Sequence, residues 1–237
     1  MLGHPKWGFK EIIFVYLLIV IFGIGFSFSE EIILGWFDQW GISYNLITFF
    51  ILALLLQIFF TILLVIIFTM GIHKTSLADL GIKGANMRDL IKYGLVGGLL
   101  IMIGVSMLGL LITMVQPELE PQVFEEVLRS VETPQEFMAL LILAAVLVPF
   151  SEELFYRGMI YPVFRKLAGP LWGAILAGLV FGLAHWDFWR TIPLAAGGAC
   201  LCYFYEKSGS ILVPTLAHGV WNGIMSLIVY ANLIAAY

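Results

Sequence analysis

Three ionisable side chains stand close together inside one apolar stretch of this sequence. Glu152, Glu153 and Arg157 lie within the run Leu147–Gly158. A charged side chain inside a bilayer costs at least ~2.5–3.5 kcal/mol on insertion scales, so such charges mark paired or functional positions. Glu153 and Arg157 are four residues apart and can pair on one helix face. Glu152 points about 100° away, which leaves it free to take a proton. A purely structural ion cluster is the alternative interpretation.

Two histidines and an asparagine occur in later apolar segments. His185 closes one segment, while His218 and Asn222 are four residues apart and share a face of the last one. Small residues at four-residue spacing let helix backbones approach closely. Such pairs lie in the same segments: Gly219 and Gly223 beside His218 and Asn222, and Gly178 and Gly182 in the segment that His185 closes, with Gly169 and Gly173 at its start. We therefore expect Glu152, His185, His218 and Asn222 to converge on one polar cavity.

This set of side chains suits hydrolysis in two versions. In the first, Glu152 and His185 hold and deprotonate a water, while His218 and Asn222 donate hydrogen bonds to the developing oxyanion. In the second, His185, His218 and a glutamate, either Glu152 or Glu153, bind Zn²⁺ and activate its water. The sequence contains neither His-Glu-x-x-His nor Gly-x-Ser-x-Gly. Both versions stay open at this point, with zinc as the possible cofactor.

The composition is that of a membrane protein. Apolar residues make up 61% of the 237 residues, charged residues 12%, and the mean hydropathy is +1.00. Soluble domains contain nearer a quarter charged residues. No basic stretch suggests a nucleic-acid partner. We expect a single integral membrane domain over residues 1–237, built as an all-α bundle with the lipid bilayer as its surroundings.

The apolar segments predict about seven membrane spans, in seven or eight helices. A helix needs about 20 residues to cross the hydrocarbon, and the fifth and sixth segments are shorter than that. The seven segments are Phe9–Phe28, Leu46–Met70, Ile91–Val115, Phe137–Tyr161, Trp172–His185, Ile192–Tyr205 and Ile211–Tyr237.

Basic residues predict the orientation. With seven crossings, Arg129 and Arg190 fall on one side, and nine other Lys and Arg residues fall on the other: Lys6, Lys10, Lys74, Lys83, Arg88, Lys92, Arg165, Lys166 and Lys207. Cytoplasmic loops carry the excess of Lys and Arg. We therefore expect a plasma-membrane protein with its N-terminus in the cytoplasm, its C-terminus outside, and a site reached from the cytoplasmic face.

One long connection is acidic. Residues 116–136 contain six glutamates and one arginine, and Val123, Val127, Leu128 and Val131 recur within them at helical spacing. A solvated acidic loop is the favoured interpretation, and a surface helix is the alternative.

The last part of the chain resembles the CPBP family, also called the Abi or type II CAAX prenyl endopeptidase family, of intramembrane proteases. The resemblance covers residues 136–237, which it implies form a catalytic core of the last four segments. Residues 1–135 are N-terminal helices without a recognised motif. The three motifs appear in order: Glu152-Glu153-x-x-x-Arg157, Phe181-x-x-x-His185 and His218-x-x-x-Asn222.

The resemblance implies an endopeptidase that cuts a lipidated or membrane-embedded peptide near the cytoplasmic membrane face. It assigns Glu152 as the base, His185 as the second partner of the water, and His218 with Asn222 as the oxyanion hole. Glu153 and Arg157 would support them. An asparagine donor beside His218 favours the metal-free version, although the motifs leave the metal open. A catalytically silent scaffold or bacteriocin-immunity protein with the same fold is the alternative function.

Overall fold

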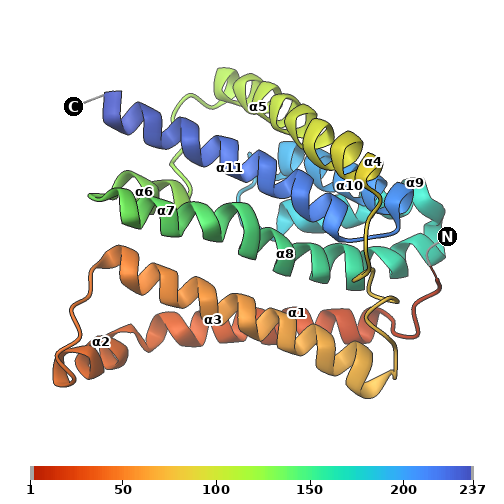
Figure 1. Cartoon of the computed structure of the whole chain (residues 1–237), viewed down its shortest axis with the longest axis horizontal. Helices are drawn as coiled ribbons and strands as arrows, with labels where there is room; N and C mark the ends of the chain where they lie inside the picture. Colours follow the sequence, from red (N-terminus) through yellow and green to blue (C-terminus); the bar gives the residue numbers. More distant parts are fainter. Residues whose placement is uncertain (1–2, 236–237) are drawn as a thin grey trace.

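The computed structural model describes residues 3–235, which contain helices and connections but no strand (Figure 1). This confirms the predicted all-α fold. The N-terminal half contains α1 (Phe9–Phe28), α2 (Glu30–Gln39), α3 (Leu46–Ile66), η1 (Ile67–Ile72), α4 (Met87–Asp89), η2 (Leu90–Val96), α5 (Gly97–Val115) and α6 (Val123–Arg129). The C-terminal half contains α7 (Pro134–Ile142), η3 (Leu143–Leu147), α8 (Val148–Glu153), η4 (Leu154–Ile160), α9 (Tyr161–Leu183), α10 (Thr191–Ser208) and α11 (Leu212–Ala235).

Five helical segments in the described part of the chain are long and apolar enough to cross a membrane. They are Phe9–Phe28, Leu46–Ile72, Met87–Val115, Pro134–Leu183 and Leu212–Ala235. Helices satisfy every backbone hydrogen bond within the segment, which a lipid environment requires. The chain is therefore an integral membrane protein. The last two residues of the predicted span Ile211–Tyr237 lie outside the described residues.

The number of candidate spans differs from the predicted seven for two reasons. The fourth and fifth predicted segments run together as Pro134–Leu183, which turns at Gly169, where φ is +76° and the next residue is Pro170. The sixth corresponds to α10, which has 18 residues and is not among the five candidates. If the helix segments before and after Gly169 are counted separately, the helices follow all seven predicted segments in order.

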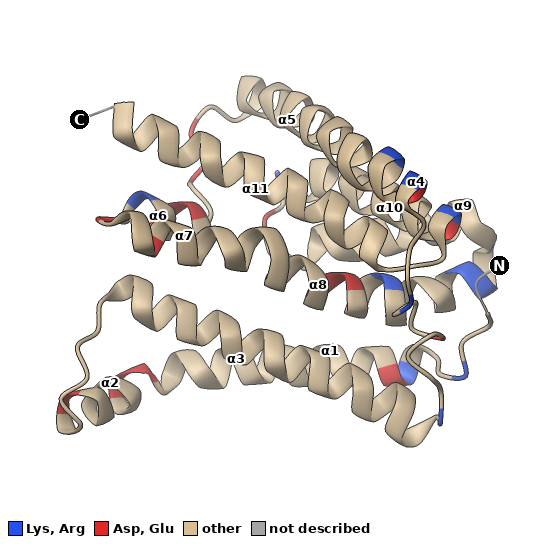
Figure 2. Cartoon of the chain, viewed as in Figure 1, with Lys and Arg blue, Asp and Glu red and all other residues tan. Residues whose placement is uncertain are grey.

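Successive long helices run in alternating directions between the two ends of the bundle (Figure 1). The hairpin of α9 and α10 reaches only part of the way from the N-terminal end. This explains why the fifth and sixth apolar segments are short. Lys and Arg gather at the N-terminal end, and fewer lie toward the other end (Figure 2). The charge pattern thus follows the topology expected from seven crossings.

Close backbone contacts fix the C-terminal helices. A Cβ atom on Gly178 would lie 2.5 Å from the carbonyl oxygen of Ala195 in α10, and one on Gly219 would lie 2.1 Å from that of Ala145 in η3. Glycine is needed at both positions because no side chain fits there. Gly169 behaves differently from the prediction. It supplies the left-handed turn between two helix segments, and a Cβ at this position would meet nothing within 4 Å, so it is no helix-packing residue.

The acidic connection forms a helix rather than a loop. In α6, Val127 and Leu128 are 3% and 1% exposed and pack with Ile47, Phe137 and Leu140. The favoured interpretation of residues 116–136 as a solvated loop was wrong over α6. The apolar spacing within α6 outweighed the six glutamates around it, because those carboxylates can stay on the wet face.

Candidate active site

The two adjacent glutamates lie on α8, between two π-helical segments. Backbone bonding widens to a π pattern over η3 before α8 and again over η4 after it. Pro149 stands at the start of α8 and has no N–H to donate. Single-turn π segments inside α-helices frequently occur at functional sites. The wider turns place Glu152, Glu153 and Arg157 on a stretch whose geometry departs from a regular α-helix.

Glu153 is the centre of a buried ion cluster. Its Oε1 accepts a hydrogen bond from Nη1 of Arg157 at 2.8 Å and lies 2.9 Å from Nδ1 of His218. Both Glu153 and Arg157 are 0% exposed. Nη2 of Arg157 donates to the carbonyl oxygen of Gly198 in α10 at 2.9 Å. The predicted Glu153–Arg157 pair is therefore present, and it joins η4 and α8 to α10 and α11.

Glu152 faces a different direction from its neighbour. Its side chain is 30% exposed, against 0% for Glu153, and its Oε2 lies 3.7 Å from Nε2 of His218. That distance is too long for a direct hydrogen bond and suits a bridging water. Glu152 is thus the carboxylate that remains accessible, as the helical spacing predicted.

His218 contacts aromatic rings as well as carboxylates. Its ring centroid lies 5.7 Å from that of Phe181 and 5.5 Å from that of Trp221. The guanidinium of Arg157 lies over the same Phe181 ring, 4.9 Å from its centroid. His218 is only 2% exposed. Two aromatic rings and, at Nδ1, Glu153 therefore restrain its orientation, which leaves Nε2 as the nitrogen nearer Glu152.

His185 and Asn222 lie at the margin of this cluster. Nδ1 of His185 is 2.8 Å from the carbonyl oxygen of Phe181, and the two rings are 4.8 Å apart. Nδ2 of Asn222 donates to the carbonyl oxygen of Ala144 at 3.3 Å. Glu153, Arg157 and His218 are therefore directly hydrogen-bonded, and Glu152 lies 3.7 Å from His218. His185 is connected to them only through Phe181. The catalytic roles of all six residues stay a prediction.

Hydrogen bonds already use some of the atoms that could bind a metal at this centre. Among residues 3–235, no three His, Cys, Asp or Glu side chains are arranged to hold a metal ion. Glu153 Oε1 is already bonded to Arg157, and Nδ1 of His218 to Glu153. Zinc binding by Glu152, Glu153, His185 and His218 stays a prediction.

Sequence reasoning missed two contributors to the cluster. The carbonyl oxygen of Gly198 accepts from Arg157, and that of Ala144 accepts from Asn222. Main-chain acceptors leave no residue-type signal, so no motif could have revealed them. Trp221 did have a signal, because it lies between His218 and Asn222 in the third motif.

The geometry agrees with a comparison against protein families. Residues 134–224, which contain α8, His185, His218 and Asn222, match the family described as "Type II CAAX prenyl endopeptidase Rce1-like". This segment is thus similar to the Rce1-like family. It begins at the first residue of α7 and contains all three motifs. The resemblance expected from the sequence is confirmed for this part of the chain, and residues 3–133 lie outside the match.

Two curated relatives share low sequence identity with this chain. A Bacillus subtilis (strain 168) protein named "Putative membrane peptidase YdiL" is 23% identical over 83 residues, which are 35% of this chain and 34% of that protein. The chain thus spans about a third of that relative's length. An Escherichia coli protein named "Uncharacterized 24.3 kDa protein" is 27% identical over 164 residues, which are 67% of this chain and 73% of the relative. No solved structure matches the chain.

Proposed function

We propose that this protein is an intramembrane endopeptidase in which Glu152 activates a water molecule. The observation that carries this proposal is the division between the two glutamates. Glu153 is buried and bonded to Arg157, while Glu152 is part-exposed and lies 3.7 Å from His218. One carboxylate is neutralised and the other remains available as a general base. The similarity to the Rce1-like family supports peptide hydrolysis as the reaction.

The hydrogen bond to Phe181 suits His185 as the second partner of the water. If Nδ1–H donates to the carbonyl oxygen of Phe181, Nε2 of a neutral imidazole is an acceptor. Glu152 would take one proton of the water, and Nε2 of His185 would accept a hydrogen bond from the other. The resulting hydroxide would add to the scissile carbonyl carbon. The proton on Glu152 would then pass to the leaving nitrogen as the C–N bond breaks.

The oxyanion role of His218 requires a particular protonation state. Arg157 holds Glu153 as a hydrogen-bond acceptor, so Nδ1 of His218 must be the donor. Nε2 can donate to an oxyanion only if the ring is an imidazolium. The cluster would then hold two carboxylates, one guanidinium and one imidazolium. Such a balance is favourable where unpaired charge is costly. Asn222 would supply the second donor through its other N–H.

We infer that the substrate is a lipidated or membrane-embedded peptide. His218 lies six residues into α11, about 9 Å along the helix axis at 1.5 Å per residue. This places the centre nearer the N-terminal, basic end of the bundle (Figure 2). The positive-inside rule assigns that end to the cytoplasm.

The test is a cleavage assay with purified full-length protein and a lipidated, fluorescently quenched peptide in micelles. Glu152→Gln keeps the side-chain size but cannot take a proton, so cleavage should fall to background while the thermal midpoint stays unchanged. Glu126→Gln, an exposed carboxylate on α6, is the matched control and should keep full activity. In the same assay, Asn222→Ala should lose about 10²–10³ in rate, as expected for one oxyanion donor.

The outcomes separate the alternatives. Full activity of Glu152→Gln would refute the proposed base. Activity that a chelator removes and Zn²⁺ restores would replace it with metal chemistry. A folded wild-type protein that binds the peptide without cutting it would favour the silent scaffold.

A further inference from the structure

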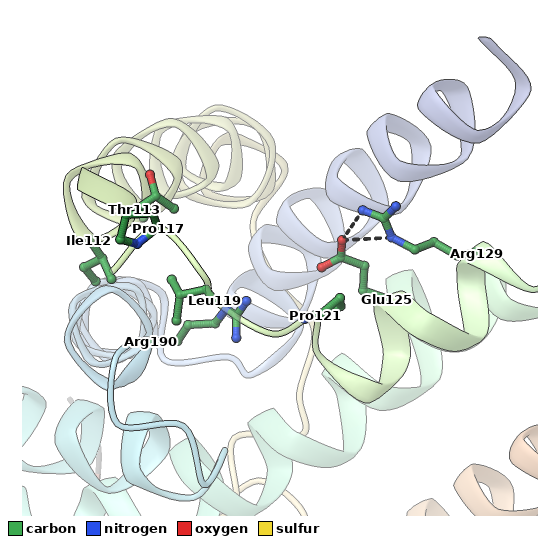
Figure 3. Close-up of a pocket in the computed structure, with 9 residues that line it drawn as sticks. Ile112, Thr113, Pro117, Leu119, Pro121, Glu125, Arg129 and Arg190 are labelled. Atoms are coloured by element: carbon green, nitrogen blue, oxygen red, sulfur yellow. Dashed lines mark hydrogen bonds and ion pairs between the residues drawn. The ribbon is translucent and has the colours of Figure 1, made fainter. Parts of the chain in front are cut away.

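A pocket on the far side of the bundle from the N-terminus has no role in the proposed reaction. It has a volume of about 290 Å³ and lies between the end of α5, the following connection, α6 and the α9–α10 loop (Figure 3). Its wall is formed by Gly109, Ile112, Thr113, Pro117, Leu119, Pro121, Glu125, Arg129 and Arg190. None of the six predicted site residues lines it.

The pocket contains both signs of charge. Its two cations are Arg129 and Arg190, the two basic residues that the span count assigned to this side of the membrane. Glu125 lies beside them and pairs with Arg129 at 2.7 Å. Arg190 pairs with Asp187. The four charged groups therefore balance, although the pocket itself carries two guanidinium groups against one carboxylate.

Each charged group keeps capacity for a ligand. Arg129 uses Nε and Nη2 on Oε1 of Glu125, and Arg190 uses Nη1 and Nη2 on Asp187 and on the carbonyl oxygen of Glu120. A guanidinium has five N–H donors, so further donors remain on both. Both bonds to Glu125 end on Oε1, which leaves Oε2 open to a donor. Arg129 is 60% exposed, and an exposed ion pair of this kind is weak enough to be shared.

The position of the pocket points to an amphiphile. Ile112 and Thr113 belong to the last turn of α5, just before the helix ends at Val115. On the same helix, Leu110, Leu111 and Met114 are 63%, 58% and 78% exposed, as expected of side chains that face acyl chains. The pocket thus lies where the apolar surface of a spanning helix meets polar groups. Arginine side chains at such a boundary can bind the phosphate of a lipid headgroup through bidentate hydrogen bonds.

The surrounding charge favours a zwitterion over an anion. The connection that borders the pocket contains six glutamates within residues 116–136. An anionic headgroup would be repelled by these carboxylates, whereas a zwitterion would place its phosphate on the arginines and its cation on Glu125. A primary ammonium can also donate a hydrogen bond to Oε2 of Glu125, which a quaternary ammonium cannot do.

We propose that this pocket binds the headgroup of a phospholipid that carries phosphate and a primary ammonium, as in phosphatidylethanolamine. Arg129 and Arg190 hold the phosphate, and Glu125 holds the ammonium. The headgroup also braces the α9–α10 loop, which contains His185, because Arg190 ties that loop to the connection through the carbonyl oxygen of Glu120. The proposal does not depend on peptidase activity.

The experiment measures the thermal midpoint of the purified full-length protein in dodecylmaltoside against lipid concentration. The probes are short-chain phosphatidylethanolamine, phosphatidylcholine and phosphatidylglycerol with identical acyl chains, and soluble phosphoethanolamine. Phosphatidylethanolamine should bind about tenfold tighter than the other two lipids, the equivalent of one charge-assisted hydrogen bond. Stabilisation by phosphoethanolamine at the same concentration would assign the site to a soluble ligand and overturn the lipid proposal.

Matched variants locate the effect. Arg129→Gln should weaken all three lipids about tenfold, while Arg88→Gln, an exposed arginine at the opposite end, should change nothing. Glu125→Gln should remove the preference for phosphatidylethanolamine over phosphatidylcholine, and Glu126→Gln should keep it. Gly109→Leu should block binding, because nothing lies within 4 Å of a Cβ at Gly109 to prevent folding. Equal stabilisation by the three lipids, or an unchanged preference in Glu125→Gln, would overturn the proposal.

Discussion

The N-terminal hairpin, formed by α1 and α3, and the C-terminal core, formed by the helices from α7 to α11, are stabilised in the membrane in opposite ways. In the apolar windows of α1 and of the segment containing α3, 11% and 17% of residues are buried, against 44% in Pro134–Leu183 and in α11. The two hairpin helices expose apolar side chains such as Phe28 and Phe59, at 84% and 63%. The core instead buries charged groups and brings backbones into contact. Lipid therefore replaces protein packing in the hairpin, whereas internal contacts determine the core.

This comparison predicts its largest effect at Arg157. Arg157→Ala should destabilise the protein by about 3–5 kcal/mol, because it leaves Glu153 buried without its guanidinium partner. The matched variant Arg129→Ala removes an exposed pair on α6 and should cost no more than about 1 kcal/mol. Thermal unfolding in detergent, followed by circular dichroism, measures both. A wild-type midpoint for Arg157→Ala would show that the ion cluster is not what holds the core together.

A medium effect on stability is expected when glycines are replaced by alanine, with opposite signs at two positions. Gly182→Ala would place its Cβ 2.4 Å from the carbonyl oxygen of Thr191 and should cost about 1–3 kcal/mol. Gly104→Ala meets nothing within 4 Å and should stabilise α5 by about 0.5–1 kcal/mol through helix propensity. The same unfolding assay compares them. If both variants shifted stability in the same direction, close packing would not distinguish the core from the peripheral helices.

The smallest effect is expected at Asp79, in the connection between η1 and α4. Hydrogen bonds from the backbone and side chain of Ser76 hold the pKa of Asp79 below its ordinary value of 3.8. A depressed pKa gives stability that is present above the unfolded-state value and lost as pH falls through the folded-state value. The midpoint difference between wild type and Asp79→Asn should thus be constant from pH 7 to pH 5 and shrink below about pH 3.8. A difference that shrinks already between pH 7 and pH 5 would contradict this assignment.

Residue spacing predicted part of the geometry of the candidate site. The four-residue intervals of Glu153–Arg157 and His218–Asn222 predicted shared helix faces, because side chains four apart are neighbours on any helix. The division between part-exposed Glu152 and buried Glu153 followed from the same geometry. Spacing could not predict the direct contact of His218 with Glu153, since this depends on how α11 crosses α8.

For the fold as well, the sequence predicted some features and not others. Apolar composition predicted the spans, because the hydrocarbon requires a long apolar helix whatever its neighbours are. It did not predict the turn at Gly169, which depends on one residue with positive φ, nor the helix α6, whose few buried side chains lie among many glutamates. The π-helical segments η3 and η4 also have no residue pattern that distinguishes them from an α-helix.

The bond from Arg157 to the carbonyl oxygen of Gly198 has a consequence for how this protein tolerates change. Every residue provides a carbonyl oxygen, so no side-chain replacement at position 198 can delete this acceptor. Only a shift of the α10 backbone can do so. A Cβ at Gly198 would lie 3.0 Å from Cα of Gly178, and so would push α10 away from its neighbour. Change at position 198 is therefore limited by volume rather than by side-chain chemistry, which is why α10 completes the cluster without a motif of its own.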